Sequence, residues 1–277
     1  MTFQMKKITD LLTGKPENQL SFSYEVTPDI ADIEFDSLNE QPLFYAVTWH
    51  AGQYRLENLE IPPITKVNLL RKQQKHVMVH LSCESMTKKY LLNLLNFYKE
   101  KGVRNILCIL GEKYKAETSD FKSTNELITF IREVTGNYFC IGVAGFPEGD
   151  DTAMARLKEK IDIGANFIVT QAFFESSILG AFLEKCKRFD INVPVLPGIF
   201  VFETKKELKD FVNKVKGKVS DNFLELTDNK LAQNQTGTDI VSELIKELNQ
   251  KWNVCHFHLF TLNKLSNINV LVKKSKI

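Results

Sequence analysis

A glutamate interrupts an otherwise apolar segment near the start of the chain. Glu25 lies between Tyr24 and Val26 in the segment Leu20–Val26. A carboxylate in such surroundings is costly unless it is paired or functional. Partial burial would raise the pKa of its carboxyl and suit it to general-acid work near neutral pH. A strand-end glutamate on a solvated edge is the competing interpretation, and this residue alone favours neither.

Polar and aromatic side chains also close the next two apolar segments. Thr48, Trp49 and His50 end the second segment, and His80 and Ser82 end the third. Alternation along a strand places His80 and Ser82 on one face. A single histidine at such a place is more often a satisfied core or rim residue than a ligand. Two segment ends with the same polar character favour a ligand pocket.

Glycines follow the fourth and fifth segments. Gly111 precedes Glu112, and Phe146 lies between Gly145 and Gly149. Glycines here either let the backbone approach a ligand closely or simply make tight turns. Their spacing matches neither G-x-G-x-x-G nor a P-loop, so a Rossmann or nucleotide-triphosphate site gets little support.

The sixth segment contains an amide. Gln171 lies within the very apolar Ile168–Phe174. A buried amide must find hydrogen-bond partners, and the edge of a heterocyclic ligand can supply them. A structural amide bonded to the backbone is the alternative.

Other catalytic constellations are weak. His256 and His258 share one face of the last apolar segment, which suits metal binding, but no third ligand of fixed spacing is visible, so we expect no metal site. The five cysteines have no C-x-x-C spacing and indicate reduced, mostly buried thiols in the cytosol. Neither a G-x-S-x-G elbow nor a Cys/His signature is present, which disfavours covalent hydrolase chemistry.

Almost all of these residues lie where short apolar segments end. Eight such segments alternate with helical patterns, as parallel βαβ units do. Eight units in one chain predict a single-domain α/β fold, the (β/α)₈ TIM barrel, whose active site forms at the C-terminal strand ends. The predicted strands are Leu20–Val26, Leu43–Trp49, His76–Cys83, Asn105–Leu110, Phe139–Gly145, Phe167–Phe174, Pro194–Phe200 and His256–Asn263.

Polar caps, proline starts and glycine ends mark the helices between these strands. Residues 1–19 are predicted to form an N-terminal helical extension, and residues 20–277 the catalytic barrel. The turn-rich residues 216–236 are predicted to be an irregular insertion, and Ile33–Leu38 has only weak helical character. The predicted helices are Lys6–Thr13, Leu59–Gln74, Thr87–Lys101, Ser123–Val134, Asp151–Ile163, Ser176–Phe189, Thr204–Val215 and Thr238–Lys251.

The composition is that of an ordinary soluble globular protein. The 277 residues are 43% hydrophobic and 25% charged, with a net charge of +2. This charge gives no electrostatic case for nucleic acid or a membrane surface, and no apolar run is long enough to span a membrane. The N-terminus has no secretory signal pattern, so we expect a cytoplasmic protein. The basic residues from Lys273 to Lys276 are predicted to be a solvated terminus.

The segment ends, taken in order, resemble the catalytic barrel of the methylenetetrahydrofolate reductase family. The resemblance implies reduction of 5,10-methylenetetrahydrofolate to 5-methyltetrahydrofolate, in which NAD(P)H passes a hydride to FAD and the reduced flavin passes it to the folate. It covers nearly the whole chain. The matching stretches are Ser21–Glu25, Val47–Gly52, His80–Cys83, Ile141–Gly149, Lys158–Gln171, Pro197–Ile199 and His258–Asn263.

This resemblance implies roles for ten residues. Glu25 matches the family's catalytic acid, since opening the imidazolidine ring needs a proton on N10 and the resulting iminium cation is stabilised by a nearby carboxylate. Gln171 matches the glutamine that holds the pterin, and Phe211 an aromatic against folate or nicotinamide. Lys264 replaces an arginine and is assigned to the substrate. The residues implied for the flavin are Thr48, His80, Gly111, Glu112, Phe146 and Lys160.

Two segments depart from the family pattern. Leu110-Gly111-Glu112 replaces the usual Arg-Gly-Asp, which keeps a negative charge but removes the polar fork of an arginine. The stretch from Phe146 to Lys160, which normally embraces the ribose and pyrophosphate of FAD, looks several residues short. It also carries Asp150 and Asp151, which would repel a diphosphate if they faced it. Their position favours capping of the next helix instead.

Three functions compete on this basis. A flavin-dependent reductase explains Glu25, His80 and Gln171 together. A flavin-independent reductase of the same substrate would explain changes confined to the FAD segments. A catalytically inactive folate-binding paralogue would keep Gln171 and Phe211 but would not require Glu25. The resemblance also implies association into a homo-oligomer and, without a regulatory domain, no feedback by S-adenosylmethionine, while the choice of NADH or NADPH stays open.

Overall fold

The strands form one parallel sheet that closes on itself. The computed structural model describes residues 4–16, 18–31, 35, 37–215 and 218–276. Within them, nine strands pair in the order β7-β6-β5-β4-β3-β2-β1-β9-β8. The strands are β1 (Ser21–Val26), β2 (Tyr45–Val47), β3 (Val77–Ser82), β4 (Asn105–Ile109), β5 (Cys140–Gly145), β6 (Phe167–Thr170), β7 (Val195–Leu196), β8 (Gly198–Phe200) and β9 (His256–Phe260).

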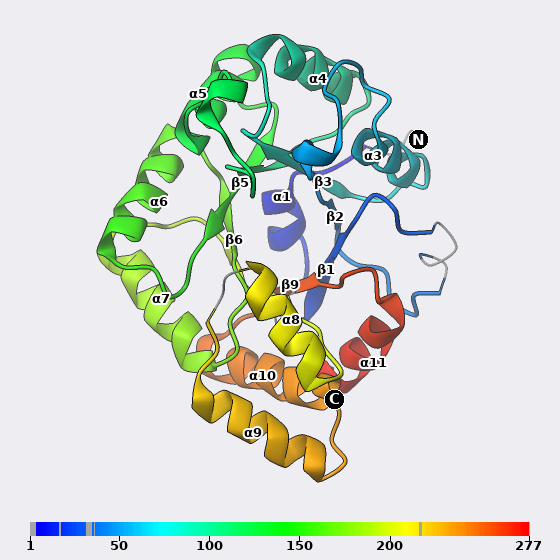
Figure 1. The fold of residues 1–277 in the computed structure, drawn as a ribbon, viewed down its shortest axis with the longest axis vertical. Coiled ribbons are helices and arrows are strands. Elements are labelled where there is room, and N and C mark those ends of the chain that lie inside the picture. Colours follow the sequence, from blue (N-terminus) through cyan, green and yellow to red (C-terminus); the bar gives the residue numbers. More distant parts are fainter. Residues whose placement is uncertain (1–3, 17, 32–34, 36, 216–217, 277) are drawn as a thin grey trace.

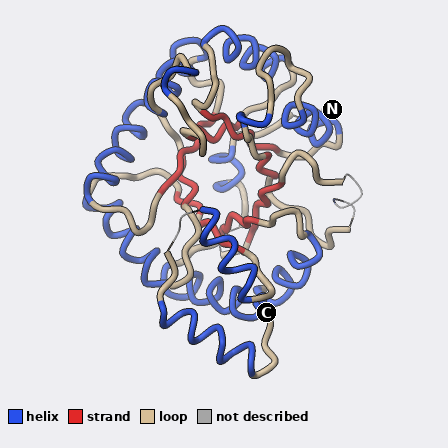
Figure 2. The backbone as a smooth tube through the Cα atoms, viewed as in Figure 1, coloured by secondary structure: helices blue, strands red, loops and turns tan. Residues whose placement is uncertain are grey.

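Pro197 divides the seventh predicted strand in two. β7 pairs with β6 and β8 pairs with β9, so the two halves close the barrel from opposite neighbours. Proline lacks the N–H that a continuous ladder needs, but its carbonyl oxygen still accepts from His258 N (2.8 Å). The strands therefore form a ring (Figure 2), and the predicted (β/α)₈ barrel is confirmed.

Helices surround this ring and follow the strands in the predicted alternation (Figure 1). Side-chain caps start several of them: the Thr87 hydroxyl accepts from Tyr90 N, and Thr236 forms a capping box with Asp239. The helices of the outer layer are α3 (Pro62–Lys72), α4 (Lys88–Glu100), α5 (Thr124–Thr135), α6 (Asp151–Ile163), α7 (Ser176–Arg188), α9 (Asp221–Ala232), α10 (Gly237–Trp252) and α11 (Leu265–Ser275). Helix α8 (Lys205–Val215) instead lies over the ring in Figure 1.

Two expectations about the C-terminal third are wrong. The predicted irregular insertion contains α9, which starts at the Ser220 cap and packs Phe223 against Phe174 at 5.4 Å between ring centroids. The predicted solvated terminus belongs largely to α11, where Ser275 is buried and Lys274 pairs with Asp239 at 2.5 Å. Half of the weakly helical Ile33–Leu38 lies outside the described residues.

The predicted N-terminal extension is part of the barrel core. Helix α1 (Ile8–Thr13) lies at the centre of the ring in Figure 1, and Ile8 is fully buried. Asn105, at the start of β4, accepts from Ile8 N (2.8 Å) through its side-chain oxygen. α1 thus closes the N-terminal end of the barrel. The apolar residues packed inside the barrel are Ile8, Phe44, Ala46, Met78, Leu107, Cys140, Phe167, Val169 and Leu196.

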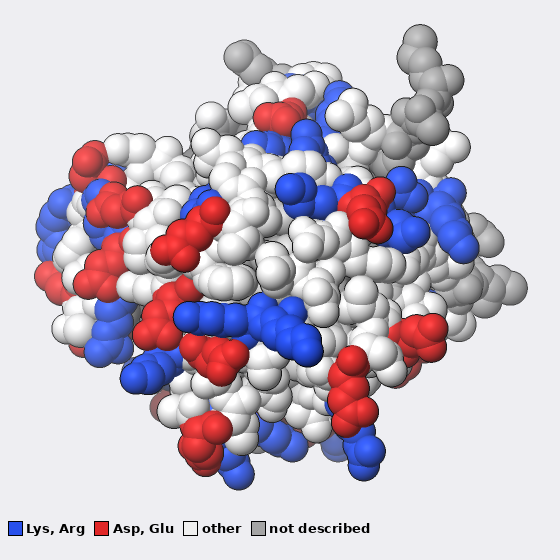
Figure 3. Space-filling view, turned by 90° about the horizontal axis from the view of Figure 1, so that it is seen from above, with Lys and Arg blue, Asp and Glu red and all other residues white. Residues whose placement is uncertain are grey.

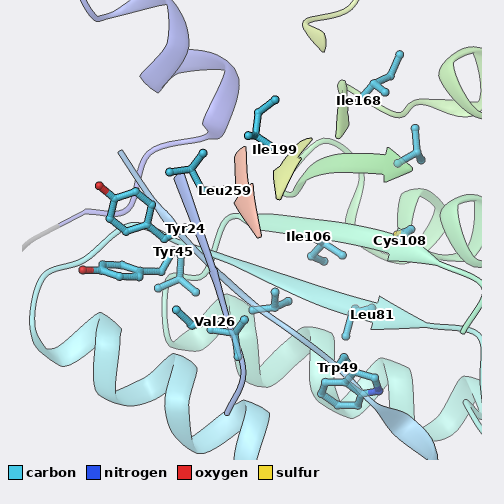
Figure 4. Close-up of a cluster of buried hydrophobic side chains, with 14 of the residues drawn as sticks. Tyr24, Val26, Tyr45, Trp49, Leu81, Ile106, Cys108, Ile168, Ile199 and Leu259 are labelled. Atoms are coloured by element: carbon cyan, nitrogen blue, oxygen red, sulfur yellow. The ribbon is translucent and has the colours of Figure 1, made fainter. Parts of the chain in front are cut away.

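A second apolar layer lies between the strands and the helices. On β1, Tyr24 and Val26 belong to this layer (Figure 4), whereas Glu25 lines a cavity within the barrel. The same alternation holds for Leu259 on β9. The strand period thus separates an apolar outer face from an inner face that carries the polar residues.

Charged side chains of both signs share the outer surface. On the face shown in Figure 3, lysines and arginines are interspersed with aspartates and glutamates. Exposed pairs such as Lys187–Glu184 and Lys251–Glu247 lie along single helices and contribute little stability each. No helix in the described part of the chain is both long and apolar enough to cross a membrane.

Candidate active site

A cavity of about 300 Å³ opens at the carboxyl ends of the strands. Its walls are the ends of β1 to β6 and β9, together with α8. This is the end at which barrels of this class build active sites. The cavity brings together eight of the ten predicted site residues, namely Glu25, Thr48, His80, Gly111, Glu112, Phe146, Gln171 and Phe211.

Glu25 lies in this cavity between two imidazoles. Its Oε2 is 3.8 Å from His80 Nε2 and 3.9 Å from His258 Nε2. Thr261, which follows β9, donates its hydroxyl to the main-chain oxygen of Glu25 (2.5 Å). The carboxylate is therefore held where β1, β3 and β9 meet.

The imidazoles decide the charge of Glu25. Burial works to raise the pKa of its carboxyl, but the contact with His258 and the charges of His80, His258 and His50 outweigh burial, and the pKa is lowered. The predicted rise in this pKa is wrong: burial does act in that direction, but three histidines from other parts of the chain outweigh it. Glu25 is thus a carboxylate at neutral pH.

Three buried polar atoms beside Glu25 have no hydrogen-bond partner within the described residues, namely Thr48 Oγ1, His80 Nε2 and His258 Nε2. Thr48 and His80 line the cavity. Burial lowers the pKa of His80 from 6.5 to about 4, although the charge of Glu25 works in the other direction. His80 is therefore a neutral imidazole. Because buried polar atoms nearly always have a partner, the unpartnered atoms of Thr48 and His80 mark a place for a ligand.

Glu84 is a buried carboxylate in the wall that the sequence patterns did not indicate. A Cβ on Gly111 would lie 2.6 Å from Glu84 Cβ, and Gly111 has a φ of +105°. A Cβ on Gly52 would lie 2.6 Å from Glu84 Oε1. The main-chain N–H of Lys113 donates to Glu84 Oε2 (3.3 Å). Position 111 therefore requires glycine, because its backbone has a positive φ and because a Cβ there would collide with the Glu84 side chain.

A second cavity of about 750 Å³ adjoins the first and shares Gly111, Glu112, Phe146 and Gln171 with it. It contains the ninth predicted residue, Lys160, whose pKa burial lowers. Lys122 and Arg156 also line it, as does the N-terminus of α5 at Ser123–Asn125. Cationic side chains beside a helix N-terminus suit an anionic ligand such as a phosphate.

Of the residues that depart from the family pattern, some line a cavity and others do not. Asp150 caps α6, its carboxylate accepting from Ala153 N (2.9 Å), and Asp151 pairs with Arg188 of α7. Neither lines either cavity. Leu110 does line the second cavity and is 42% exposed, and Phe146 is 53% exposed at the junction of the two. Apolar side chains exposed on a concave wall are typical of a ligand-binding surface.

The predicted substrate residues are divided. The side-chain oxygen of Gln171 accepts from Ala172 N (3.1 Å), so its amide is partly a structural one, and its side chain lines both cavities. Phe211 of α8 stacks on Phe200 with ring centroids 3.7 Å apart. The tenth predicted residue, Lys264, lines neither cavity and instead pairs with Glu207 of α8 at 2.6 Å.

Comparison with known proteins identifies the family to which the chain belongs. The family model for methylenetetrahydrofolate reductase matches residues 30–276. The chain belongs to the methylenetetrahydrofolate reductase family. It is 27% identical to methylenetetrahydrofolate reductase 2 of Schizosaccharomyces pombe, over 97% of this chain and 47% of that protein. It is 28% identical to 5,10-methylenetetrahydrofolate reductase of Escherichia coli, over 67% of this chain and 65% of that protein.

The chain spans about half the length of several of its relatives in this family. A solved structure of similar fold is an uncharacterized protein from Clostridium thermocellum that binds two copies of 5-methyl-5,6,7,8-tetrahydrofolic acid. It has a TM-score of 0.67, is 14% identical, and the alignment covers 97% of this chain and 96% of that one. At this identity the likeness shows the fold. Glu25 lies just before the residues that the family model matches.

Two features of this family member escaped sequence reasoning. Glu84 follows β3 by two residues, and a carboxylate after Ser82-Cys83 was the available signal. His256 and His258 were considered only as metal ligands, whereas both imidazoles contact serine hydroxyls of β1. Within the described residues, no group of three histidine, cysteine, aspartate or glutamate side chains could hold a metal ion.

Proposed function

We propose that this chain reduces 5,10-methylenetetrahydrofolate to 5-methyltetrahydrofolate with a hydride from NAD(P)H, carried through bound FAD. The observation that carries the proposal is the position of the Glu25 carboxyl between His80 and His258, within the cavity of a member of this family. The names of the relatives support the reaction, and the folate bound by the Clostridium thermocellum protein supports the substrate.

The residues of the two cavities fit a flavin dinucleotide. Thr48 and His80 offer unpartnered polar atoms at the barrel axis, and Phe146 offers an exposed aromatic face. Lys160 and Arg156 lie in the second cavity, where the N-terminus of α5 adds a site for a diphosphate. When bound, FAD accepts a hydride from the nicotinamide and supplies it to the folate.

Folate would lie against the other wall of the first cavity. The side-chain NH₂ of Gln171 has no protein partner within the described residues, so it is available to an acceptor on the pterin. Phe211 and Phe260 supply aromatic surface beside it, with ring centroids 6.1 Å apart. Both surfaces line the same cavity as Glu25, so a folate bound there would lie within reach of the carboxylate.

Glu25 would carry the proton chemistry. Opening the imidazolidine ring needs a proton on N10 and leaves a cationic iminium, which a nearby carboxylate stabilises. A bound substrate would displace water from the Glu25 carboxylate, and desolvation favours its protonated form. Glu25 can then donate to N10 and, once ionised, stabilise the cation until the hydride arrives.

The first experiment is a visible absorption spectrum of the purified protein, repeated after incubation with FAD. We expect a flavin spectrum that NAD(P)H bleaches and methylenetetrahydrofolate restores. A colourless protein that takes up no FAD would exclude the flavin-dependent reaction. Turnover of the folate by that colourless protein would then indicate the flavin-independent reductase, and folate binding without turnover would indicate an inactive binding protein.

Replacement of Glu25 tests its role directly. Glu25→Gln should slow folate reduction by roughly 10²–10⁴-fold, because it removes the proton donor, while reduction of an artificial quinone by NAD(P)H continues. The matched control is Glu203→Gln, a carboxylate that follows β8 and lines neither cavity; it should leave both activities unchanged. Undiminished folate reduction by Glu25→Gln would contradict the assigned role.

A further inference from the structure

Hydroxyl and imidazole groups alternate along the inner face of β1 and β9. The parallel register sets Ser21 beside His256 and Ser23 beside His258, and Glu25 is the next inward residue of β1. These five side chains form a line through the barrel, parallel to its strands. The Phe44 ring stacks on both imidazoles, with centroids 5.7 Å from His256 and 6.3 Å from His258.

Short contacts join the members of this line. Ser21 Oγ is 2.9 Å from His256 Nδ1, His256 Nε2 is 3.1 Å from Ser23 Oγ, and Ser23 Oγ is 2.8 Å from His258 Nδ1. The last separation, from His258 Nε2 to Glu25 Oε2, is 3.9 Å. Hydrogen bonds to catalytic groups are often long without substrate and tighten when it binds.

The donors and acceptors along this line can all point the same way. A hydroxyl donates one hydrogen bond and accepts others, and a neutral imidazole donates from one nitrogen and accepts at the other. His256 is neutral, because burial and the charges of His258 and Lys15 hold its pKa well below the ordinary value. If His258 donates from Nε2 to Glu25, its Nδ1 must accept from the Ser23 hydroxyl. Ser23 must then accept from His256 Nε2, and His256 Nδ1 must accept from the Ser21 hydroxyl.

The two ends of the line lie at opposite faces of the barrel. Glu25 lines the cavity at the carboxyl ends of the strands. Ser21, at the start of β1, is only partly buried, and its hydroxyl can donate either to the main-chain oxygen of Cys255 (3.2 Å) or to His256 Nδ1 (2.9 Å), the second being the direction that the line requires. The ammonium group of Lys15 donates to that same oxygen (2.5 Å). The far end is thus polar and near solvent.

We propose that Ser21, His256, Ser23 and His258 form a proton relay that returns a proton to Glu25 from the N-terminal face of the barrel while substrate fills the cavity. This inference rests on the proposed function, in which Glu25 gives its proton to N10 of the folate. The relay matters at that moment because bound folate blocks the route from solvent on the cavity side.

Each step moves one proton and no electrons. The His258 Nε2–H bond breaks as Glu25 gains a proton, and His258 Nδ1 takes the proton of Ser23. Ser23 Oγ then takes a proton from His256 Nε2, and His256 Nδ1 takes a proton from Ser21 Oγ. Water at the far face replaces the proton of Ser21. After product release, water in the open cavity protonates His258 Nε2. The reverse hops then release one proton at Ser21 and restore the original direction.

The first test needs no turnover. The five histidines of the chain can be assigned in ¹⁵N-labelled protein by single substitution, and their tautomers read by NMR at pH 8, above the ordinary imidazole pKa of about 6.5. The relay requires His256 and His258 to carry the proton on the same nitrogen, Nε2. Opposite tautomers would break the line at Ser23 and overturn the proposal.

The second test measures rates. Ser23→Ala should slow folate reduction roughly tenfold, less than loss of the proton donor itself, and should change the solvent deuterium isotope effect, while NAD(P)H-dependent quinone reduction is unchanged. Ser21→Ala, at the partly exposed end, should act in the same direction with less risk to folding. The matched control is Ser275→Ala, which removes a buried hydroxyl whose one hydrogen bond among the described residues is to Leu271 O in α11.

These outcomes separate the relay from the proposed function. One outcome is that the wild type reduces folate while Ser21→Ala and Ser23→Ala keep its rate and its solvent isotope effect. That result would overturn the relay and leave the proposed function intact. Absence of folate reduction in the wild type would overturn the proposed function, and the tautomer measurement would then decide whether the five groups form a directed line.

Discussion

His80 shows how a single buried side chain links the cavity to acid stability. It is neutral and buried beside Glu25, and its pKa is about 4 compared with 6.5 when unperturbed. Between these two values the unfolded chain binds a proton that the folded protein does not. Folding stability must therefore fall as pH drops through this range. The carboxylate of Glu25, whose pKa is also lowered, adds to the loss at lower pH.

The free energy of unfolding should decrease by about 2 kcal/mol between pH 7.5 and pH 5.0 on account of His80. Urea titrations at the two pH values measure this loss. His80→Gln, which cannot be charged, should show a correspondingly smaller decrease, and His76→Gln, at the edge of the barrel, should behave more like the wild type. An equal pH dependence in His80→Gln and wild type would contradict the assignment.

Glu25 and the histidines around it show which properties of a single residue can be predicted from the sequence. Glu25 could be singled out because a carboxylate within Ser21–Val26 is chemically out of place. Its lowered pKa could not, because His50, His80 and His258 are far from it in the sequence and meet it only through strand pairing. A residue type is visible in a sequence, but the charges around it depend on the fold.

The two aspartates at the start of α6 allow a test of whether the segment after Phe146 opposes binding of an anionic ligand. Asp150 caps the helix, whereas Asp151 forms an exposed pair with Arg188. Asp150→Ala should lower the free energy of unfolding by about 1 kcal/mol, and Asp151→Ala by well under about 1 kcal/mol. Neither carboxylate lines either cavity. Under the proposed function, FAD affinity measured by fluorescence quenching should therefore stay the same in both variants.

A clear gain in FAD affinity in either aspartate variant would show that the carboxylate does repel the diphosphate. The matched comparison is Glu159→Gln, since Glu159 lines the second cavity beside Lys160. Removal of that charge should strengthen binding of an anionic ligand, because like charge in a cavity wall opposes it. The three variants together separate a helix cap from a ligand contact.

Element prediction succeeded where burial leaves a clear period and failed where it does not. Strands β3 and β6 are buried at every residue, so they appear in the sequence as short, mostly apolar runs. In α9 only Phe223 and Thr227 are buried, which leaves almost no helical stripe to find. α11 does carry one, through Leu265, Ile268 and Leu271, but the following lysines concealed it. Pro197 was the signal for the divided strand.

At the scale of the whole molecule, the two ends of the barrel have separate tasks. The carboxyl ends of the strands hold eight of the ten predicted site residues, while the other end is closed by α1. The barrel could be foreseen from the alternation of strands and helices. The position of α1 inside the ring could not, because a short amphipathic helix does not show which surface it covers.

Asn105 is the residue that fastens this closed end. It is fully buried, its side-chain oxygen accepts from Ile8 N, and its amide donates to the carbonyl oxygens of Lys6 (3.0 Å) and Val77 (3.2 Å). Asn105→Ala leaves these main-chain groups unpaired and should lower the free energy of unfolding by about 3 kcal/mol.

The barrel architecture predicts that this damage stays at the closed end. In such barrels the C-terminal ends of the strands carry the activity and the N-terminal face contributes stability. If the proposed function holds, folded Asn105→Ala should therefore have the same KM for methylenetetrahydrofolate as the wild type. The control is Asn137→Ala, an exposed asparagine near α1, which should change stability by less than about 0.5 kcal/mol. Urea unfolding and steady-state kinetics on the same preparations decide the matter. A raised KM in Asn105→Ala would mean that the packing of α1 is transmitted along the barrel interior to the cavity, and that the two ends are coupled.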